Sequence, residues 1–519
     1  MDMFGGLTKT SSRIAIAAAL GMTLGGFAMS ASPAKAADLG GDCCADLEER
    51  VAELEATTVR KGNKKVSVTL SGWVVKLGEF WDDGHETNFY VGDKDTTLSS
   101  HFQISGSATI SPGWSAGYTI AIEIPGQSCS VGFAENQFND DACAFGNINT
   151  LLSYMWIKSD AYGTLNWGQL SQPTDNVWIL TDLSGTVIES NAVVFDGSAM
   201  RVRVKGAKNS NDIAGEFNWS AFLTCLGAGF GTGADCNGYP ENVIRYDSPT
   251  WGGFSASSSY GDDDMWDVAV KYAADWNSIK VSAAAGYANM TDEGCIAVGA
   301  CTKVPVFGGG GTPFQGFRKD TDVWQVGGSV MHVPSGLWVH GYWQQEDNKG
   351  TQLTTLNFKT PTSVSNSAAN EDETWFIKAG IKRTWLAAGA TVLWGEWGQY
   401  NDMFSFQCGG KPGAGCPTLI PTSTPFPDGI KGEITDEEGV VNGSEVQRWG
   451  IGVLQEIDSA AMHLFARWQR LSIDVGATST GLACPSGAGL CFGNGRFGKG
   501  INTNFEDLDI YQIGGVIFF

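Results

Sequence analysis

Two groups of opposite charge lie next to each other in the middle of the chain. The stretch 171–199 contains four carboxylates: Asp175, Asp182, Glu189 and Asp196. It runs directly into "MRVRVKG", whose three cations alternate with valines and so share one face of a strand: Arg201, Arg203 and Lys205. Opposed rows of fixed charge create an electric field between them, and rings of charged side chains are how pores select ions. The alternatives are a solvated basic face for the cations, and turn capping or a surface position for each carboxylate.

Catalytic chemistry is not favoured by the sequence. An enzyme would need a Ser/His/acid set that converges at one place, but the chain has no G-x-S-x-G and its five histidines are scattered: His85, His101, His332, His340 and His463. The balance of 33 basic and 56 acidic residues also argues against nucleic-acid binding, which needs a basic footprint. We therefore expect no enzymatic activity, no cofactor and no nucleic-acid partner.

Ten of the twelve cysteines form five close pairs, each in a Gly/Asn/Asp-rich segment between strand-like runs. In an exported protein this pattern predicts five local disulfides. The pairs are Cys129 and Cys143, Cys225 and Cys236, Cys295 and Cys301, Cys408 and Cys416, and Cys484 and Cys491. Metal binding is the alternative, but no pair has C-x₂-C spacing, so we expect no metal.

The N-terminus is typical of a secretory signal. Lys9 and Arg13 precede an apolar run, and residues 34–36 form an A-x-A cleavage site. The alternative, a retained membrane anchor, is less favoured because the run is short of the ~20 apolar residues that a span needs. We expect residues 1–36 to be a cleaved signal peptide and the mature chain to begin at Ala37.

Residues 37–62 are expected to form a periplasmic segment with one short helix over 45–59. In that helix, apolar positions recur at the a/d spacing of a short coiled coil: Leu47, Val51, Leu54 and Thr58. Two heptads are too few to be stable alone, so something else must bring the chains together. Cys43 and Cys44 directly precede the helix and are candidates for cross-links between chains.

From residue 63 to 519 the chain repeats a unit of strand, short turn, strand and long loop. In "MWDVAVKYAADW", apolar and charged residues alternate from Trp266 to Trp276, which is typical of a long strand with one apolar face. Short turns at one end and long loops at the other indicate an outer-membrane barrel. The predicted fold is an all-β, transmembrane, antiparallel up-and-down β-barrel. We count eighteen strands, including 200–206 and 213–223, with sixteen as the alternative.

A barrel of either size is too wide for side chains to fill, so it encloses water. On each strand, the face that carries the charged residues must then line the lumen, and the apolar face must point to the lipid. The stretch 171–199 lacks a cysteine pair and is unusually apolar for a surface loop, so we expect it to pack against the inner wall as a constriction loop. Weaker candidates for the lumen lining, by parity alone, are Lys76, Lys271, Lys280, Arg245, Lys378, Lys382, Arg448 and Arg467.

Four stretches carry a resemblance to a known family. They are "CCADLEERVAELEATTVRKGNKKVSVTLSGWV", "WDDG", "YDSPTWGGFSASSSYGDD" and the aromatic end "IYQIGGVIFF". In these stretches the chain resembles the alphaproteobacterial general porins. The resemblance implies a homotrimeric channel in outer-membrane lipid and lipopolysaccharide, for passive diffusion of small hydrophilic solutes. It also implies a third loop folded into the lumen and an N-terminal coiled coil on the periplasmic side.

The C-terminus belongs to the same resemblance. Phe519, with Tyr511, Ile513 and Ile517 on its parity, matches the strand signal that the barrel-assembly machinery reads. An ordinary closing strand is the alternative. General porins usually have sixteen strands, so a count of eighteen departs from the family.

Two other functions stay open. A sugar-selective eighteen-stranded channel would need an aromatic track along the lumen, whereas most tryptophans fall on the lipid parity or beside turns. The barrel could also tether the outer membrane to peptidoglycan through Ala37, because some barrels of this group that begin with Ala-Asp or Ala-Glu are linked in that way.

Overall fold

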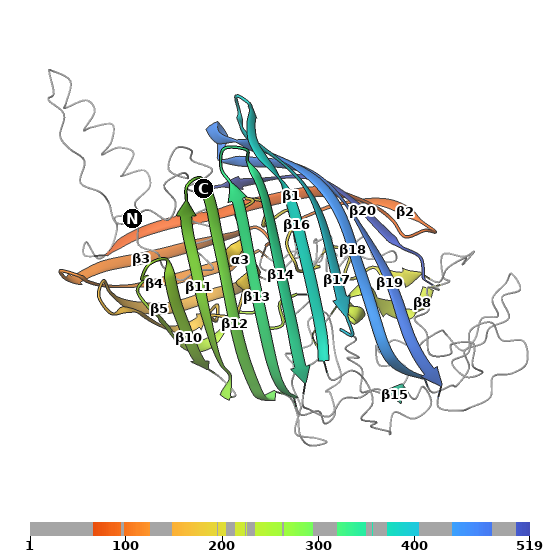
Figure 1. Cartoon of the computed structure of the whole chain (residues 1–519), viewed down its shortest axis with the longest axis horizontal. Coiled ribbons are helices and arrows are strands. Elements are labelled where there is room, and N and C mark those ends of the chain that lie inside the picture. Colours follow the sequence, from red (N-terminus) through yellow and green to blue (C-terminus); the bar gives the residue numbers. More distant parts are fainter. Residues whose placement is uncertain are drawn as a thin grey trace, which may run out of the picture.

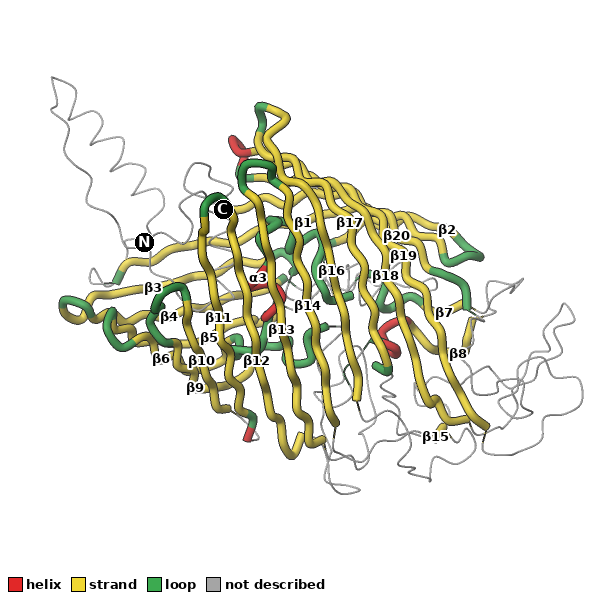
Figure 2. The backbone as a smooth tube through the Cα atoms, viewed as in Figure 1, coloured by secondary structure: helices red, strands yellow, loops and turns green. Residues whose placement is uncertain are grey.

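The computed structural model describes the barrel-forming part of the chain. The described residues are 66–94, 98–124, 148–194, 196–203, 213–223, 225, 234–261, 264–293, 319–348, 355–356, 371–403, 439–479 and 505–519. They form a wall of long antiparallel strands, with turns gathered at one end (Figures 1 and 2). The predicted signal peptide, coiled-coil helix and Cys43–Cys44 pair lie outside the described residues.

A closed ring of strands forms the body of the molecule. In order around the ring they are β1 (Ser67–Asp82), β3 (His101–Ser111), β4 (Trp114–Glu123), β5 (Asn149–Ser159), β6 (Gly163–Leu170), β9 (Glu241–Asp247), β10 (Phe254–Gly261), β11 (Trp266–Trp276), β12 (Ile279–Glu293), β13 (Lys319–His332), β14 (Leu337–Asn348), β16 (Glu371–Leu386), β17 (Gly389–Asn401), β18 (Gly439–Ile457), β19 (Met462–Ser479) and β20 (Leu508–Phe518). The ring closes where β20 pairs antiparallel with β1. Closure removes the exposed sheet edge, which a membrane does not tolerate.

Two further strands join this sheet without lengthening the ring. β2 (Thr87–Gly92) pairs with the second half of β1, residues 77–82, whereas β3 pairs with the first half, residues 67–73. β15 (Thr355–Leu356) is a two-residue addition to β18. Of the eighteen strands of the sheet, sixteen therefore make the ring in the described part of the chain.

The predicted count of eighteen is wrong, and the alternative of sixteen is confirmed. The two surplus predictions are 200–206 and 213–223, which contain β7 (Arg201–Arg203) and β8 (Ile213–Asn218). These two strands pair with each other in a separate two-stranded sheet. Alternation of apolar and polar residues marks any strand with two unlike faces, so it does not distinguish a hairpin inside a loop from a barrel strand.

The two faces of the barrel strands follow the predicted parity. On β11, Trp266, Val268 and Val270 are exposed on the outer face, and Asp267 and Ala269 between them are buried on the inner face. β11 has 11 residues, which matches the roughly 9–11 residues that a tilted strand needs to cross a bilayer. The outer face is therefore the apolar face, as a membrane barrel requires.

Helices contribute little to the described residues. The one α-helix among them is α3 (Val177–Thr181), which lies in the connection after β6 (Figure 2). None of the helices in the part that the structure describes has the length and apolar character to cross a membrane.

Candidate functional site

The connection between β6 and β9 runs from residue 171 to residue 240, and its described residues 171–194 and 196–199 lie inside the barrel. Its first part, residues 171–199, is here called the lumen loop; α3 of this loop packs against the inner side of β12, β13 and β14 (Figure 1). Almost every described side chain of the lumen loop is buried. The predicted constriction loop therefore lies inside the ring, although its role in limiting the passage of solutes is a separate question.

Two glycines of the wall allow the lumen loop to approach closely. A Cβ atom at Gly286 on β12 would lie 2.8 Å from Thr174 Cγ2, and one at Gly327 on β13 would lie 2.8 Å from Thr181 Oγ1. A larger side chain at either position would push α3 away from the wall. The inner faces of β12 and β13 are thus shaped to receive the loop.

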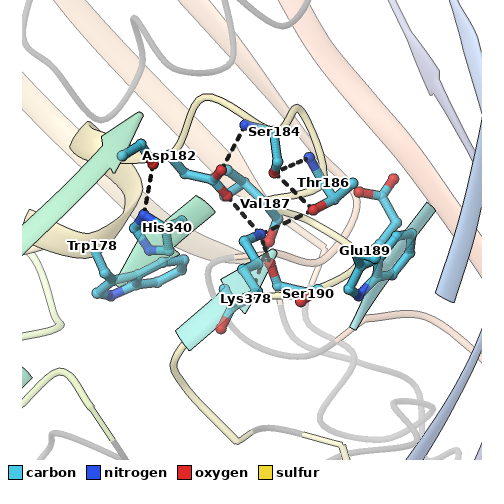
Figure 3. Close-up of polar contacts among 12 residues, drawn as sticks. Trp178, Asp182, Ser184, Thr186, Val187, Glu189, Ser190, His340 and Lys378 are labelled. Carbon is cyan, nitrogen blue, oxygen red and sulfur yellow. Dashed lines mark hydrogen bonds and ion pairs between the residues drawn. The ribbon is translucent and has the colours of Figure 1, made fainter. Parts of the chain in front are cut away.

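A buried lysine of β16 fixes the middle of the lumen loop (Figure 3). The Lys378 ammonium lies 2.7 Å from Asp182 Oδ2. It also donates to Thr186 Oγ1 at 2.9 Å and to the carbonyl oxygen of Ser190 at 2.7 Å. An ammonium has three donors, so these three acceptors from one loop satisfy it.

The same contacts determine the charge of Asp182. Burial raises the pKa of this carboxyl, but the Lys378 ammonium, His340 and the hydrogen bonds from Lys378 and Ser184 together outweigh burial and hold the pKa below its usual range. Asp182 Oδ1 also accepts from the Ser184 amide at 2.8 Å. Asp182 is therefore the anionic half of a loop-to-wall ion pair, and Lys378 already neutralises it.

A second set of ion pairs holds the far end of the loop. Asp196 Oδ2 lies 2.8 Å from Lys94 Nζ and 3.0 Å from Arg467 Nη2 on β19. Burial raises the pKa of Asp196, and the two cations more than offset this, so that the pKa is about 2. This carboxylate therefore stays ionised well into the acidic range.

Backbone carbonyl groups of the lumen loop are held by the same wall. Arg448 on β18 donates to the carbonyl oxygens of Asn191 and, at 3.2 Å, Val193. Arg467 donates to the carbonyl oxygen of Glu189. These guanidinium groups hold the loop backbone in place.

The start of the lumen loop is bound to the opposite side of the ring. Asp267 on β11 accepts from the Thr174 amide at 2.7 Å and from its hydroxyl at 2.8 Å. Arg245 on β9 donates to the carbonyl oxygen of Ser171 at 2.7 Å. The loop is thus attached at its start, middle and end.

A disulfide-closed segment supports α3 from the side. Cys225 and Cys236 are joined by a disulfide, and the Cys236 amide donates to Gln344 Oε1 on β14 at 3.0 Å. The adjacent Asp235 accepts from Trp178 Nε1 at 2.9 Å and from the Asn176 amide at 3.3 Å. Burial raises the pKa of Asp235 to about 7.

Sequence reasoning did not identify Asp235 as a site residue, because nothing in a Gly/Asn/Asp-rich segment shows where it packs. The other four predicted cysteine pairs lie outside the described residues, so the structure does not bear on them.

The predicted acidic residues have different surroundings. Asp182 and Asp196 are paired with cations of the barrel, and Glu189 Oε1 lies 3.3 Å from His463 Nδ1 on β19. Asp175 accepts from the side-chain amide of its neighbour Asn176, and its Oδ2 atom has no hydrogen-bond partner among the described residues. Burial and the nearby Asp235 raise the pKa of Asp175 well above its usual range.

Of the predicted basic wall, the two described residues do not lie on strands of the ring. Arg201 and Arg203 lie on β7, outside the ring, and Lys205 lies outside the described residues. Arg203 instead pairs with Asp83 at 2.6 Å and with Glu86 at 2.8 Å, in the turn between β1 and β2. The prediction failed because this hairpin alternates in the same way as a barrel strand.

The cations that do point inward are those assigned by parity alone. Seven of them follow the inner face of their strands: Arg245, Lys271, Lys280, Lys378, Lys382, Arg448 and Arg467. Lys76 is an exception, since its side chain is 62% exposed on the outer parity of β1 and lies 2.5 Å from Asp93 Oδ2. The residues next to Lys76 on the inner face are apolar, Val75 and Leu77.

A cavity of about 80 Å³ remains between the lumen loop and the wall across from its anchors. The loop side includes Asp175, Ile179, Asp182, Val187, Ile188 and Glu189. The wall side includes Trp73, His101, Ala121, Leu152 and Phe518, from β1, β3, β4, β5 and β20. This cavity separates the loop from β1, β3, β4 and β5, and His463 of β19 lies at its border.

Comparison with known proteins gives one family and several related folds. A family model described as Gram-negative porin matches residues 15–459. The anion-selective porin from Comamonas acidovorans has a TM-score of 0.47 and 16% identity, over 88% of this chain and 100% of that chain. The outer membrane channel DcaP of Acinetobacter baumannii has a TM-score of 0.42 and 10% identity, over 89% and 100%. Outer-membrane expressed OmpT of Vibrio cholerae has a TM-score of 0.43 and 10% identity, over 89% and 100%. No curated protein sequence matches the chain.

Proposed function

The chain belongs to the Gram-negative porin family, and we propose that its lumen loop forms the narrow section of the channel. As a member of this family, the protein is an outer-membrane channel for passive diffusion of small hydrophilic solutes, and it is a channel rather than an enzyme. The proposal concerns which residues limit that diffusion. It assigns the limit to residues 171–199 and, among them, to Asp175, Asp182, Glu189 and Asp196.

The observation that carries the proposal is the attachment of the lumen loop across the interior of a closed ring. Salt bridges from Lys378, Lys94 and Arg467 hold its carboxylates. A segment held in this way reduces the cross-section open to solutes, and a ring of sixteen strands would otherwise enclose a wide aqueous lumen. Inward cations of the wall therefore support the proposal by holding the loop in place, a role that the sequence analysis had not given them.

Diffusion measurements test the proposal directly. Proteoliposomes that contain the purified protein should swell in small sugars and should exclude larger oligosaccharides sharply. Variants that lengthen the side chain beneath α3, such as Gly327→Leu, displace the loop and are expected to change this size limit. An unchanged limit in such variants, with the barrel still folded, would contradict the assignment of the lumen loop.

We also propose a homotrimer, because three neighbouring strands on one side of the barrel are short. β6, β9 and β10 have 8, 7 and 8 residues, fewer than the roughly 9–11 that a membrane-crossing strand needs. The outer face of β10 carries small residues, Ala256 and Ser258, which are exposed. Contact with neighbouring copies would cover this wall, and light scattering of the detergent-solubilised protein should give the mass of three chains, whereas one chain would contradict it.

The finer assignments from the sequence belong to the same proposal. They are a cleaved signal peptide over 1–36, a periplasmic coiled coil within 37–62, chain cross-links through Cys43 and Cys44, and a place among the alphaproteobacterial general porins. Recognition of Phe519 by the assembly machinery and a peptidoglycan link at Ala37 complete them. Mass spectrometry of muropeptides tests the last, and the absence of any species containing Ala37 would rule it out. Sugar selectivity is not proposed, since the ring does not have eighteen strands.

A further inference from the structure

Under the proposed function, solutes pass through the cavity beside the lumen loop, and the composition of this cavity is unusual for a passage of hydrophilic solutes. Its wall side is mostly apolar: Trp73, Leu98, Ala121, Leu152 and Phe518. Apolar side chains of the loop, Ile179, Val187 and Ile188, also line it. The carboxylates of the cavity lie on the loop side, whereas the wall side is mostly apolar apart from His101 and His463.

Aromatic rings pack together on the wall side. The rings of Trp73 and His101 have centroids 3.7 Å apart, and those of Trp73 and Phe518 are 6.3 Å apart. Trp73 Nε1 already donates to the carbonyl oxygen of Leu98 at 3.2 Å. The indole therefore offers a solute its aromatic surface, since its one donor is engaged.

The cations of the lumen lie away from this cavity. Within the described residues, the side chains that line it include no lysine or arginine. Lys378, Arg448 and Arg467 bind the loop from the opposite side, where their donors are engaged by the carboxylates and carbonyl oxygens of the lumen loop. The passage consequently lacks the row of cations that would complete a transverse field between opposed charges.

Asp175 is the cavity carboxylate with the least compensation. It is 2% exposed, and its Oδ2 atom has no hydrogen-bond partner among the described residues. A hydrogen bond with the Ser171 side chain and the charge of Arg245 offset only part of the effect of burial and of Asp235, and the pKa of Asp175 remains raised. The Asp175 carboxyl group therefore lacks a full positive counter-charge, which a cationic solute could supply.

We propose that the passage favours small organic cations that carry an apolar group, such as protonated aryl or alkyl amines, over anions of the same size. The ammonium group would approach Asp175 and Glu189, and the apolar group would lie against Trp73, Leu152 and Phe518. Attraction between unlike charges is stronger in a site with little water, and an aromatic face adds a cation–π contribution. This inference rests on the proposed role of the lumen loop and names the class of solute that the loop admits.

A pair of ions of nearly equal size and opposite charge tests the proposal. Reversal potentials across planar bilayers that contain the purified, full-length mature protein would be measured with benzylammonium chloride and with potassium benzoate, each against potassium chloride. The expected permeability of benzylammonium exceeds that of benzoate by about tenfold or more, which corresponds to about 1.4 kcal/mol. Equal permeabilities, or a preference for benzoate, would overturn the inference.

Two variants probe the two sides of the cavity. Asp175→Asn keeps the shape of the side chain but removes the carboxyl group that could pair with an ammonium ion, and it should lower the preference for benzylammonium at least about threefold. Leu152→Lys places a cation on the apolar wall of β5 and should abolish or reverse the preference, whereas Leu152→Gln, which is polar but uncharged, should keep its sign. A preference that is unchanged in both Asp175→Asn and Leu152→Lys would contradict the role of this cavity.

A matched control removes a carboxylate outside the lumen. Asp322 lies on the outer parity of β13 and accepts from Tyr287 and Asn289, so Asp322→Asn should leave the preference unchanged; a loss equal to that of Asp175→Asn would overturn the inference. Conductance in potassium chloride separates the two proposals. A protein that conducts potassium chloride without the organic-cation preference refutes the inference alone, and an unchanged size limit in folded Gly327→Leu refutes the proposed role of the lumen loop.

Discussion

Lys378 shows how a single buried charge determines the position of a loop. Its side chain is fully buried, and its three acceptors all come from the lumen loop. A buried ion pair adds little net stability compared with apolar packing, but removal of one partner leaves an uncompensated charge at a cost of about 3–5 kcal/mol. The ammonium therefore serves mainly to specify where the loop lies.

The first prediction follows from this contact. Lys378→Met leaves Asp182 without its cation and should release the middle of the lumen loop, which increases single-channel conductance and current noise. Thermal unfolding should show a loss of stability of up to about 3 kcal/mol. Lys280→Met, on the inner face of β12, is the matched control and should leave the conductance and noise near those of the unmodified channel. A quiet channel of normal conductance in Lys378→Met would show that Lys378 does not hold the loop.

The second prediction concerns pH. The pKa of Asp196 is about 2 in the folded protein, below the usual value near 4. A lowered pKa stabilises the fold fully above the unfolded value, and that contribution is lost as the pH falls toward the folded value. The shift corresponds to about 3 kcal/mol, so Asp196→Asn should be less stable than the unmodified protein at pH 6, and the difference should shrink steadily as the pH falls toward 2. A difference that disappears already at pH 5 would contradict the double pairing of Asp196.

For single residues, the sequence predicted the strand face on which a side chain lies better than it predicted the partner of that side chain. Parity alone placed Lys378, Arg448 and Arg467 on the inner face, because side chains on a strand alternate strictly. It could not pair them with Asp182 or Asp196, since those contacts join residues far apart in the sequence. The error at Lys76 arose on β1, where the inner parity is occupied by apolar residues such as Val75 and Leu77.

Two described parts of the connection between β6 and β9 contact each other, namely the lumen loop and the disulfide-closed segment at Asp235. The lumen loop contacts the wall directly, and the disulfide-closed segment holds α3 through Asp235 and contacts β14 through Cys236. Because Trp178 and Asn176 both donate to Asp235, the position of α3 depends on this second segment. The connection is therefore braced from the wall and from its own C-terminal part.

The third prediction tests that bracing. Cys225→Ser combined with Cys236→Ser should allow residues near Asp235 to move away from α3, and should give a larger and more variable single-channel conductance. Treatment of the unmodified protein with a reductant should have the same effect. The double variant lacks the Cys225–Cys236 bond, so loss of this bond cannot change its conductance when the reductant is added. Identical conductance distributions in the oxidised protein and the double variant would show that the disulfide does not support the lumen loop.

The elements were predictable where their pattern was repeated and long. The strands near β11, β12 and β16 follow from alternation that extends through a membrane-sized segment, and the apolar character of 171–199 correctly indicated a buried loop. The short hairpin of β7 and β8 was mistaken for barrel strands because three to six residues carry too little pattern to show which sheet they join. The brace formed by Asp235 has no local sequence signature.

The whole molecule is a closed wall with an asymmetric interior. The lumen loop is bound to β9 and to strands between β11 and β19, and the cavity lies on the side of β1 and β3 to β5. Wide closure follows from the number of amphipathic strands, which the sequence supplies. The asymmetry of the interior does not follow from the number of strands, because the asymmetry depends on which inward residues contact the loop and which face the cavity.

The central claim is that solutes pass beside the lumen loop, and thiol modification during single-channel recording tests it most directly. Ile188 of the lumen loop lines the cavity, and Ile244 is exposed on the outer face of β9. A bulky charged thiol reagent should reduce the current through Ile188→Cys in steps and should leave the current through Ile244→Cys unchanged. A modified Ile188→Cys channel, confirmed by mass spectrometry, whose current does not change would contradict the claim.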